Sequence, residues 1–509
     1  MLIFNTVTRT GRSNPDSWNY VNVAKNILTG KGLTQPTLGF NQENFSLDAK
    51  PPVAFIDQAP LYPVMIAGVS YLGIPPARAA LLLSAVFQAL VFVMIFVLAT
   101  ALYDKRVGLI SAALLLFYHP MRAVESWALT EPIAVTLLLV SLWLLAEKRT
   151  RGGPEGSTLT NRIFIFIAGL CSGAAFATRY ALIVFGLVGV AFLLLSPPGW
   201  REKTIDTVSY AVGWAIPVSA VFLHNLITAG VLMPVHRART GFRKNLYDTL
   251  NAIFDRYWNG PPSNSHIVLS LLSILTIGAV FIARRDFVTA CRDLFISNRR
   301  YLLVGWSAVY LAFLIIRRSF SYFDIDARII LPAGIVLVVL WSAALLRAVR
   351  LSILPTQLIA VALLLIAVWQ QVNAAIEAPP LDFEKIVQSS ERLSWIAKHT
   401  TERDLIIGYD VVEIPFLLNR PSTFSFSPLP WSDPPTYDKV MSYARRHCDS
   451  YENIYIVIKA PPYPASEEDW RSYFGLFFAD LVAGGEDHYD GIKRVADLNE
   501  ALIFQIDCH

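Results

Sequence analysis

Residues 79–102 read AALLLSAVFQALVFVMIFVLATAL, an apolar run without a charged residue. A helix that crosses a bilayer needs about 20 predominantly apolar residues, so this run predicts a transmembrane helix. Nine further runs predict the same structure, at 107–122, 130–147, 162–178, 180–197, 207–225, 265–283, 301–317, 329–347 and 355–373. The sequence therefore predicts about ten spans.

The composition also indicates a polytopic membrane protein. Of the 509 residues, 54% are hydrophobic and 16% are charged, and the mean hydropathy is +0.46. The net charge of +4 gives no support to a nucleic-acid partner. The four cysteines lack metal-ligand spacing, which excludes a zinc ribbon, and a disulfide between Cys448 and Cys508 stays open because a sequence does not fix Cα separation.

Basic residues occupy alternate loops between the spans, for example Lys105 with Arg106 and Arg201 with Lys203. The positive-inside rule places these loops in the cytoplasm. The opposite, outer side then holds residues 14–63, the turns at 119–130 and at 179, the loops 226–264 and 317–328, and the C-terminal region. The amino terminus would also begin outside, so we expect a preceding transmembrane helix to be missing; insertion with the terminus outside is the alternative.

From about residue 377 the pattern becomes that of a soluble domain. Three short β-branched runs predict strands at 405–409, 454–458 and 501–506, and helices are predicted near Glu384 and from Ser466. We expect a mainly α protein in three parts. These are a first extracytoplasmic loop with amphipathic helices at 1–78, a multi-span transmembrane domain at 79–376, and a small extracytoplasmic α/β domain at 377–509.

Asp16 is the first candidate for chemistry, within the polar stretch 14–63. The sequence Asn14-Pro-Asp-Ser17 also suits a helix N-cap, in which the aspartate accepts a backbone N–H. A carboxylate on the outer face of a membrane is, however, well placed to deprotonate an acceptor hydroxyl. Both interpretations are open on the residues alone.

Thr130-Glu131-Pro132 opens an apolar span on the outer side. Threonine caps helices, glutamate favours the positive helix end and proline fits the first turn, so a purely structural interpretation is available. An ionisable residue that enters a spanning helix is equally a functional candidate. The motif therefore stays open between the two.

Several outer-side arginines are candidates for phosphate binding. Arg179 lies between two apolar runs without an obvious local carboxylate, and its side chain either reaches the interface or captures a lipid phosphate. Arg317 and Arg328 offer the same choice. The scattered histidines form no metal-ligand set and no cofactor is expected, although outer-loop carboxylates could bind a divalent cation.

The order of these motifs resembles the GT-C glycosyltransferases, in particular the dolichyl-phosphate-mannose protein mannosyltransferases and the lipid A aminoarabinose transferases. The resemblance covers about residues 14–345. It is carried by Asp16 with Tyr20 and Ala24, Gly30-Lys-Gly32-Leu33, Ala59-Pro-Leu-Tyr-Pro63, Thr130-Glu131-Pro132, Ala177-Thr-Arg179, His224-Asn225, and Asp326-Ala-Arg328 leading to Leu331-Pro332.

The resemblance implies a GT-C membrane fold and a glycosyltransferase of the plasma membrane. It would transfer a sugar from a polyprenyl-phosphate donor, undecaprenyl or dolichyl, to a hydroxyl of a protein, lipid or glycan on the extracytoplasmic face, with inversion. One departure is that no second acidic residue stands directly beside Asp16, as it does in the protein mannosyltransferases. The expected site comprises the base Asp16, the phosphate-binding Arg179, Arg317 and Arg328, and the substrate-positioning Thr130, Glu131, His224 and Asn225.

A binding or scaffold protein whose C-terminal domain is the working part is one alternative function, and a lipid or solute transporter, or flippase, is the other. It too would place charged residues within spans. We would expect it to show repeat symmetry and broken helices at matched positions, and the sequence shows no such pattern.

Overall fold

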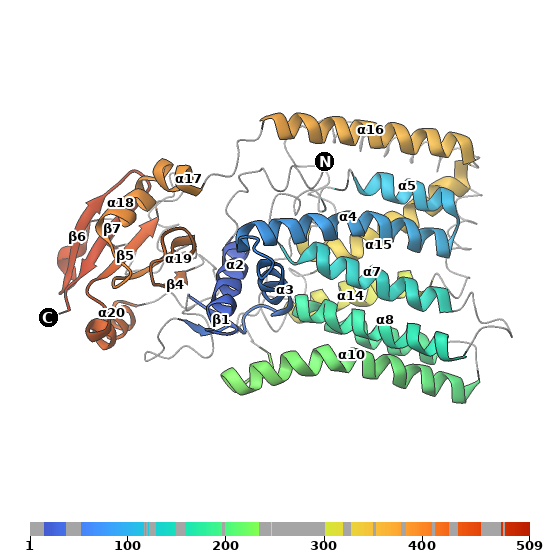
Figure 1. Cartoon of the computed structure of the whole chain (residues 1–509), viewed down its shortest axis with the longest axis horizontal. Helices are drawn as coiled ribbons and strands as arrows, with labels where there is room; N and C mark the ends of the chain where they lie inside the picture. The colour runs from blue at the N-terminus through green and yellow to red at the C-terminus, as the bar shows by residue number, and fades with distance from the viewer. Residues whose placement is uncertain are drawn as a thin grey trace. The chain divides into compact units, whose positions relative to one another are not determined.

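The structure is a computed structural model of the 509-residue chain (Figure 1). It describes residues 15–36, 52–116, 118, 121, 129–148, 158–195, 199–233, 246, 301–318, 327–349, 353–377, 383–409, 413–426, 436–459, 480–481 and 484–508. The chain divides into two compact units. The helical unit comprises Met1–Arg9, Ala80–His224 and Arg239–Pro379, and the mixed unit comprises Thr10–Ala79, Asn225–Ala238 and Pro380–His509.

Apolar helices of different lengths build the helical unit, and Figure 1 shows the labelled ones with their axes roughly aligned. They are α4 (Pro76–Leu102), α5 (Lys105–Leu115), α7 (Glu131–Lys148), α8 (Thr158–Thr178), η1 (Tyr180–Ile183), α9 (Val184–Leu194), α10 (Trp200–Ala229), α14 (Tyr301–Arg318), α15 (Ala327–Val349) and α16 (Ile353–Glu377). Among the described residues, α4, α8 and α10 are long and apolar enough to cross a membrane.

The apolar runs predicted from the sequence lie largely on helices where the structure describes them, but α5 ends at Leu115, and the described Tyr118 of the predicted run 107–122 is not helical. The predicted run 265–283 lies outside the described residues. The predicted division near residue 179 is observed, because α8 ends at Thr178 and Arg179 adopts an extended backbone with φ −152° and ψ 116° before η1 begins.

Small residues and aromatic rings determine how the helices of this unit pack. A Cβ on Gly169 or Gly213 would collide with a backbone carbonyl of the facing helix, so glycine allows α8 and α10 to approach closely. The rings of Phe185 in α9 and Trp306 in α14 stack with centroids 4.3 Å apart. The hydroxyl of Tyr310 in α14 donates to the carbonyl of Ile329 in α15 over 2.8 Å.

A five-stranded sheet with the order β4-β3-β5-β7-β6 forms the C-terminal part of the mixed unit. Its strands are β3 (Leu405–Tyr409), β4 (Ser422–Phe426), β5 (Ile454–Lys459), β6 (Ile492–Asp497) and β7 (Ala501–Ile506). Strand β3 is parallel to both β4 and β5, and β7 is antiparallel to β5 and β6. The sheet is therefore mixed, with its parallel strands on one side.

Alternate residues of the central strands face two separate cores, as a period of two requires. The helices of this part are α17 (Phe383–Ser389), α18 (Glu391–His399), α19 (Glu413–Leu418) and α20 (Tyr437–His447). Ile454 and Ile456 pack with Tyr443 of α20, whereas Tyr455 and Val457 share a core with α18.

The three predicted strands are observed as β3, β5 and β7. The sequence did not predict β4 or β6, which are the two edge strands of the sheet. Edge strands bury less apolar surface, and β6 reads Ile-Lys-Arg-Val-Ala-Asp, so the apolar pattern is weak there. The helix predicted from Ser466 lies outside the described residues.

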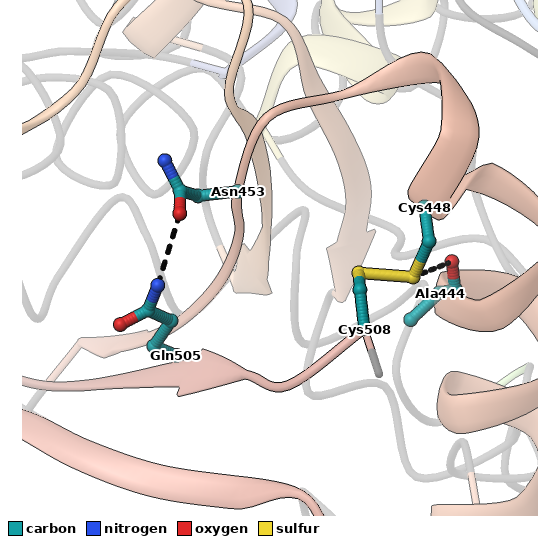
Figure 2. The surroundings of a disulfide bond; sticks show 5 residues. All are labelled: Ala444, Cys448, Asn453, Gln505 and Cys508. Atoms are coloured by element: carbon teal, nitrogen blue, oxygen red, sulfur yellow. Dashed lines mark hydrogen bonds between the residues drawn. A yellow bond between two sulfur atoms is a disulfide. The ribbon is translucent and has the colours of Figure 1, made fainter.

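A disulfide between Cys448 and Cys508 closes the C-terminal part, as Figure 2 shows. The two Cα atoms are 5.5 Å apart, within the usual range for a disulfide. Nearby, the amide of Gln505 in β7 donates to Oδ1 of Asn453 over 3.0 Å. The question that the sequence left open is thus resolved in favour of the bridge.

The N-terminal part of the mixed unit contains α2 (Pro15–Leu28), the two-residue strands β1 (Thr34–Gln35) and β2 (Val53–Ala54), and α3 (Leu61–Ser70). Helix α2 ends in a Schellman motif, with Lys31 N–H bonded to Asn26 O and Gly30 N–H to Ile27 O. This motif needs a positive φ, which Gly30 supplies at +77°. Helix α2 packs against both α3 and α19.

Candidate active site

Asp16 lies in the first turn of α2, in a helix held by aromatic packing. The ring of Tyr20, one turn further along, is 5.2 Å from the ring of Tyr62 and 6.4 Å from that of Phe55, both edge to face. All three rings are buried. These contacts hold α2 against α3 and against the residue that follows β2, so a packed core sets the position of the helix that carries Asp16.

Asp16 is joined to a second carboxylate by three amide side chains. Nε2 of Gln58 donates to Oδ1 of Asp16 over 2.8 Å, and Nε2 of Gln35 donates to Oδ2 of Asp57 over 2.9 Å. Between them, Nδ2 of Asn19 contacts Oε1 of Gln35 at 3.3 Å and Oε1 of Gln58 at 3.5 Å. We call these five residues the carboxylate–amide network.

The network bears on both interpretations of Asp16, the helix cap and the general base. Because α2 begins at Pro15, Asp16 lies inside the first turn, where a carboxylate also favours the positive helix end. Its Oδ1 accepts a side-chain N–H from a residue 42 positions away, a contact that a local helix cap does not need. The carboxylate is half-buried and oriented, which suits a general base.

Asp57 is the functional candidate that reasoning from the sequence missed. Asp57 lies in the same polar stretch, 14–63, but far from Asp16 in the sequence, and no residue directly beside Asp16 is acidic. The antiparallel pair β1–β2 places Gln35 and Asp57 within hydrogen-bonding distance across 22 residues. An Asp-Gln dipeptide directly before the Ala59-Pro-Leu-Tyr-Pro63 motif was the available signal.

Glu131 and Arg179 form an ion pair within the helical unit. The Glu131 side chain, in the first turn of α7, is 2% exposed, and that of Arg179 is 21% exposed. The hydroxyl of Thr130 donates to Oε2 of Glu131 over 3.4 Å. No carboxylate lies near Arg179 in the sequence, and the partner that the structure shows, Glu131 of α7, comes from 48 positions away.

The structure also places the remaining predicted residues on their helices. His224 and Asn225 lie in the last two turns of α10, where Nδ2 of the fully buried Asn225 donates to the carbonyl of Leu232 over 2.9 Å and so closes the turn after the helix. Arg317 is half-buried in the last turn of α14. Arg328 is the second residue of α15, and its side chain lies outside the described part.

The described residues contain no group of three or more histidine, cysteine, aspartate or glutamate side chains that could hold a metal ion. The Asp16 and Asp57 carboxylates, together with the amide oxygens between them, are oxygen ligands of the kind that a hard divalent cation prefers. A cation at this position therefore stays a hypothesis.

The fold defines a class of protein. Apolar helices of spanning length, such as α4, α8 and α10, are typical of an integral membrane protein.

Three solved structures and one family are similar to this chain. ArnT from Cupriavidus metallidurans in the apo state matches with a TM-score of 0.59 and 13% identity, over 100% of this chain and 96% of that chain. The same protein bound to undecaprenyl phosphate gives 0.55 and 11%, over 99% and 96%. The apo Archaeoglobus fulgidus oligosaccharyltransferase gives 0.52 and 11%, over 89% and 66%.

Residues 57–226 match the family described as dolichyl-phosphate-mannose-protein mannosyltransferase. A search of the curated proteins found no match. The matched segment begins at Asp57 and includes Glu131, Arg179 and Asn225. At these identities the solved structures establish the fold: the chain has the GT-C fold, resembles the GT-C glycosyltransferases and is an integral membrane protein.

Proposed function

We propose that this protein is a membrane glycosyltransferase that transfers a sugar from a polyprenyl-phosphate donor to a hydroxyl acceptor. The observation that carries the proposal is the Asp16 carboxylate, oriented by Gln58 in a chain with the GT-C fold. The fold alone is shared by proteins with different donors and acceptors. A fixed carboxylate adds a group able to perform the one proton transfer that the reaction needs.

The proposed reaction needs a base but no strong general acid. The acceptor hydroxyl gives its proton to Asp16 as its oxygen bonds to the anomeric carbon of the sugar. The bond from that carbon to the phosphate oxygen breaks, and the polyprenyl phosphate leaves with the bonding electrons. Displacement from the opposite face inverts the anomeric carbon. A phosphate is already a stable leaving group, so charge stabilisation is the remaining requirement.

Arginine side chains are suited to stabilise the phosphate, because guanidinium groups bind phosphate oxygens in pairs. We assign this role to Arg179, with Arg317 and Arg328 as further candidates. Thr130, His224 and Asn225 are assigned to positioning the substrate. Glu131 is assigned to holding Arg179, since its carboxylate is buried and paired with that guanidinium.

Two separate observations support the choice of donor and of the side of the membrane. ArnT, which matches the whole chain, has been solved with undecaprenyl phosphate, and this supports a polyprenyl-phosphate donor. The Cys448–Cys508 disulfide supports an extracytoplasmic C-terminal domain, because disulfides persist in oxidising compartments. We therefore place the reaction on the outer face of the plasma membrane, with a protein, lipid or glycan as the acceptor.

The proposal is tested by transfer of labelled sugar from polyprenyl-phosphate donors with purified protein. Asp16→Asn should lower the transfer rate by about 100-fold or more, the range expected for loss of a general base. Asp438→Asn is the matched control, because Asp438 is an exposed aspartate in the first turn of α20, and it should retain the activity. Undiminished transfer by correctly folded Asp16→Asn protein would contradict the base assignment.

A further inference from the structure

The carboxylate–amide network holds a residue that no motif singled out, Asn19. We propose that Asn19 is a positioning residue that fixes the orientation of the Gln58 and Gln35 amides, and through them the carboxylates of Asp16 and Asp57. This inference rests on the proposed role of Asp16 as the base. It extends that role by naming what holds the base in its reactive orientation.

The direction of each hydrogen bond carries the inference. A primary amide has a donating NH₂ end and an accepting carbonyl end. Nδ2 of Asn19 faces both glutamine carbonyls, at 3.3 Å for Gln35 and 3.5 Å for Gln58. Each glutamine therefore turns its NH₂ end outward, to Asp57 at 2.9 Å and to Asp16 at 2.8 Å.

The three amides are coupled, because no one of them can be reversed alone. A reversed Gln58 would present its carbonyl oxygen to the Asp16 carboxylate and its NH₂ group to that of Asn19, so both contacts would become repulsive. A reversed Asn19 would place three carbonyl oxygens together. The side chain of Gln35 is 2% exposed, so water has little access to relieve such a mismatch.

Asn19→Asp tests this logic with almost no change in shape. Aspartate has no N–H, so the new carboxylate would attract the NH₂ ends of Gln58 and Gln35. Both glutamine carbonyls would then face Asp16 and Asp57. The base would lose its N–H partner and gain a repulsive neighbour, while the aromatic packing around Tyr20 would be unchanged.

The matched control is Asn26→Asp on the same helix. Nδ2 of Asn26 donates to the carbonyl of Thr34 over 2.9 Å, so this substitution also adds an acid to α2 and removes a side-chain donor. It does not touch the network. Two quantities are measured for each protein: kcat for sugar transfer, and the Kd for undecaprenyl phosphate alone, which requires no chemistry.

For Asn19→Asp we expect kcat to fall about 10-fold to 100-fold, as for loss of a hydrogen bond to a charged group. Its Kd for undecaprenyl phosphate should stay within about threefold of wild type, and Asn26→Asp should keep kcat within the same margin. At lower pH the introduced carboxylate becomes protonated, and the carboxylic acid then supplies an O–H donor. The kcat of Asn19→Asp relative to wild type should therefore rise as the pH falls, which a structural defect would not produce.

Four results would overturn the inference. They are wild-type kcat in Asn19→Asp, an equal loss of kcat and lipid binding, an equal loss in Asn26→Asp, and a pH-independent ratio. If Asn19→Asp does not fold, Gln58→Met removes the donor to Asp16 directly and should give the same loss of kcat with unchanged Kd; wild-type kcat there overturns the inference too. Absence of transfer by the wild-type protein would instead refute the proposed function.

Discussion

The pair Glu131–Arg179 predicts an asymmetric response to mutation. Removing one member of a buried ion pair costs about 3–5 kcal/mol, because the other charge is left uncompensated. Arg179→Met leaves the charge of Glu131, whose side chain is 2% exposed, so the full cost is expected. Glu131→Gln leaves Arg179 at 21% exposure, where water reaches part of the guanidinium, and about 1–3 kcal/mol is expected.

The double variant Glu131→Gln/Arg179→Met decides whether the two residues act as a pair. It removes both charges of this pair, so it should be more stable than Arg179→Met alone despite carrying an additional substitution. The measurement is the midpoint of thermal unfolding of the full-length protein in one detergent. The expected order, from most to least stable, is wild type, then Glu131→Gln and the double variant, then Arg179→Met.

Arg162→Met is the control for this series, because Arg162 is an exposed arginine on α8, the helix that ends directly before Arg179, and should be nearly neutral when replaced. The reasoning would be refuted if Glu131→Gln proved as destabilising as Arg179→Met. It would also be refuted if the double variant unfolded below Arg179→Met, since simple additivity would mean that the two charges do not interact.

Two further predictions concern stability. Reducing the Cys448–Cys508 disulfide, which spans 60 residues, should destabilise the C-terminal part by about 4 kcal/mol through loop entropy, and Cys171→Ser should have little effect; equal unfolding midpoints with and without reductant would contradict this. Gly189→Ala should cost about 1–3 kcal/mol, because its Cβ would collide with the Tyr210 ring, which is held by a 3.2 Å hydrogen bond to the carbonyl of Phe185. Gly305→Ala in α14 meets nothing within 4 Å and should be neutral or slightly stabilising, so equal behaviour of the two variants would argue against this packing.

The sequence by itself determined the helices and the inner strands. Apolar runs of spanning length specify α4, α8 and α10 because a bilayer demands that length. The central strands β3, β5 and β7 were predicted for a related reason, since buried strands are continuous and β-branched. The resemblance to GT-C glycosyltransferases was likewise readable from the order of short motifs.

The partners of the polar side chains were decided only by the tertiary structure. Arg179 pairs with Glu131, which is 48 positions away in the sequence. Asp57 shares a network with Asp16 across 41 positions, and Cys448 is bonded to Cys508 across 60 positions. Periodicity and propensity describe neighbours within a few residues, whereas these contacts depend on how whole helices and strands pack. A carboxylate thus shows its charge in the sequence, but its partner, its burial and its orientation exist only once the chain is folded.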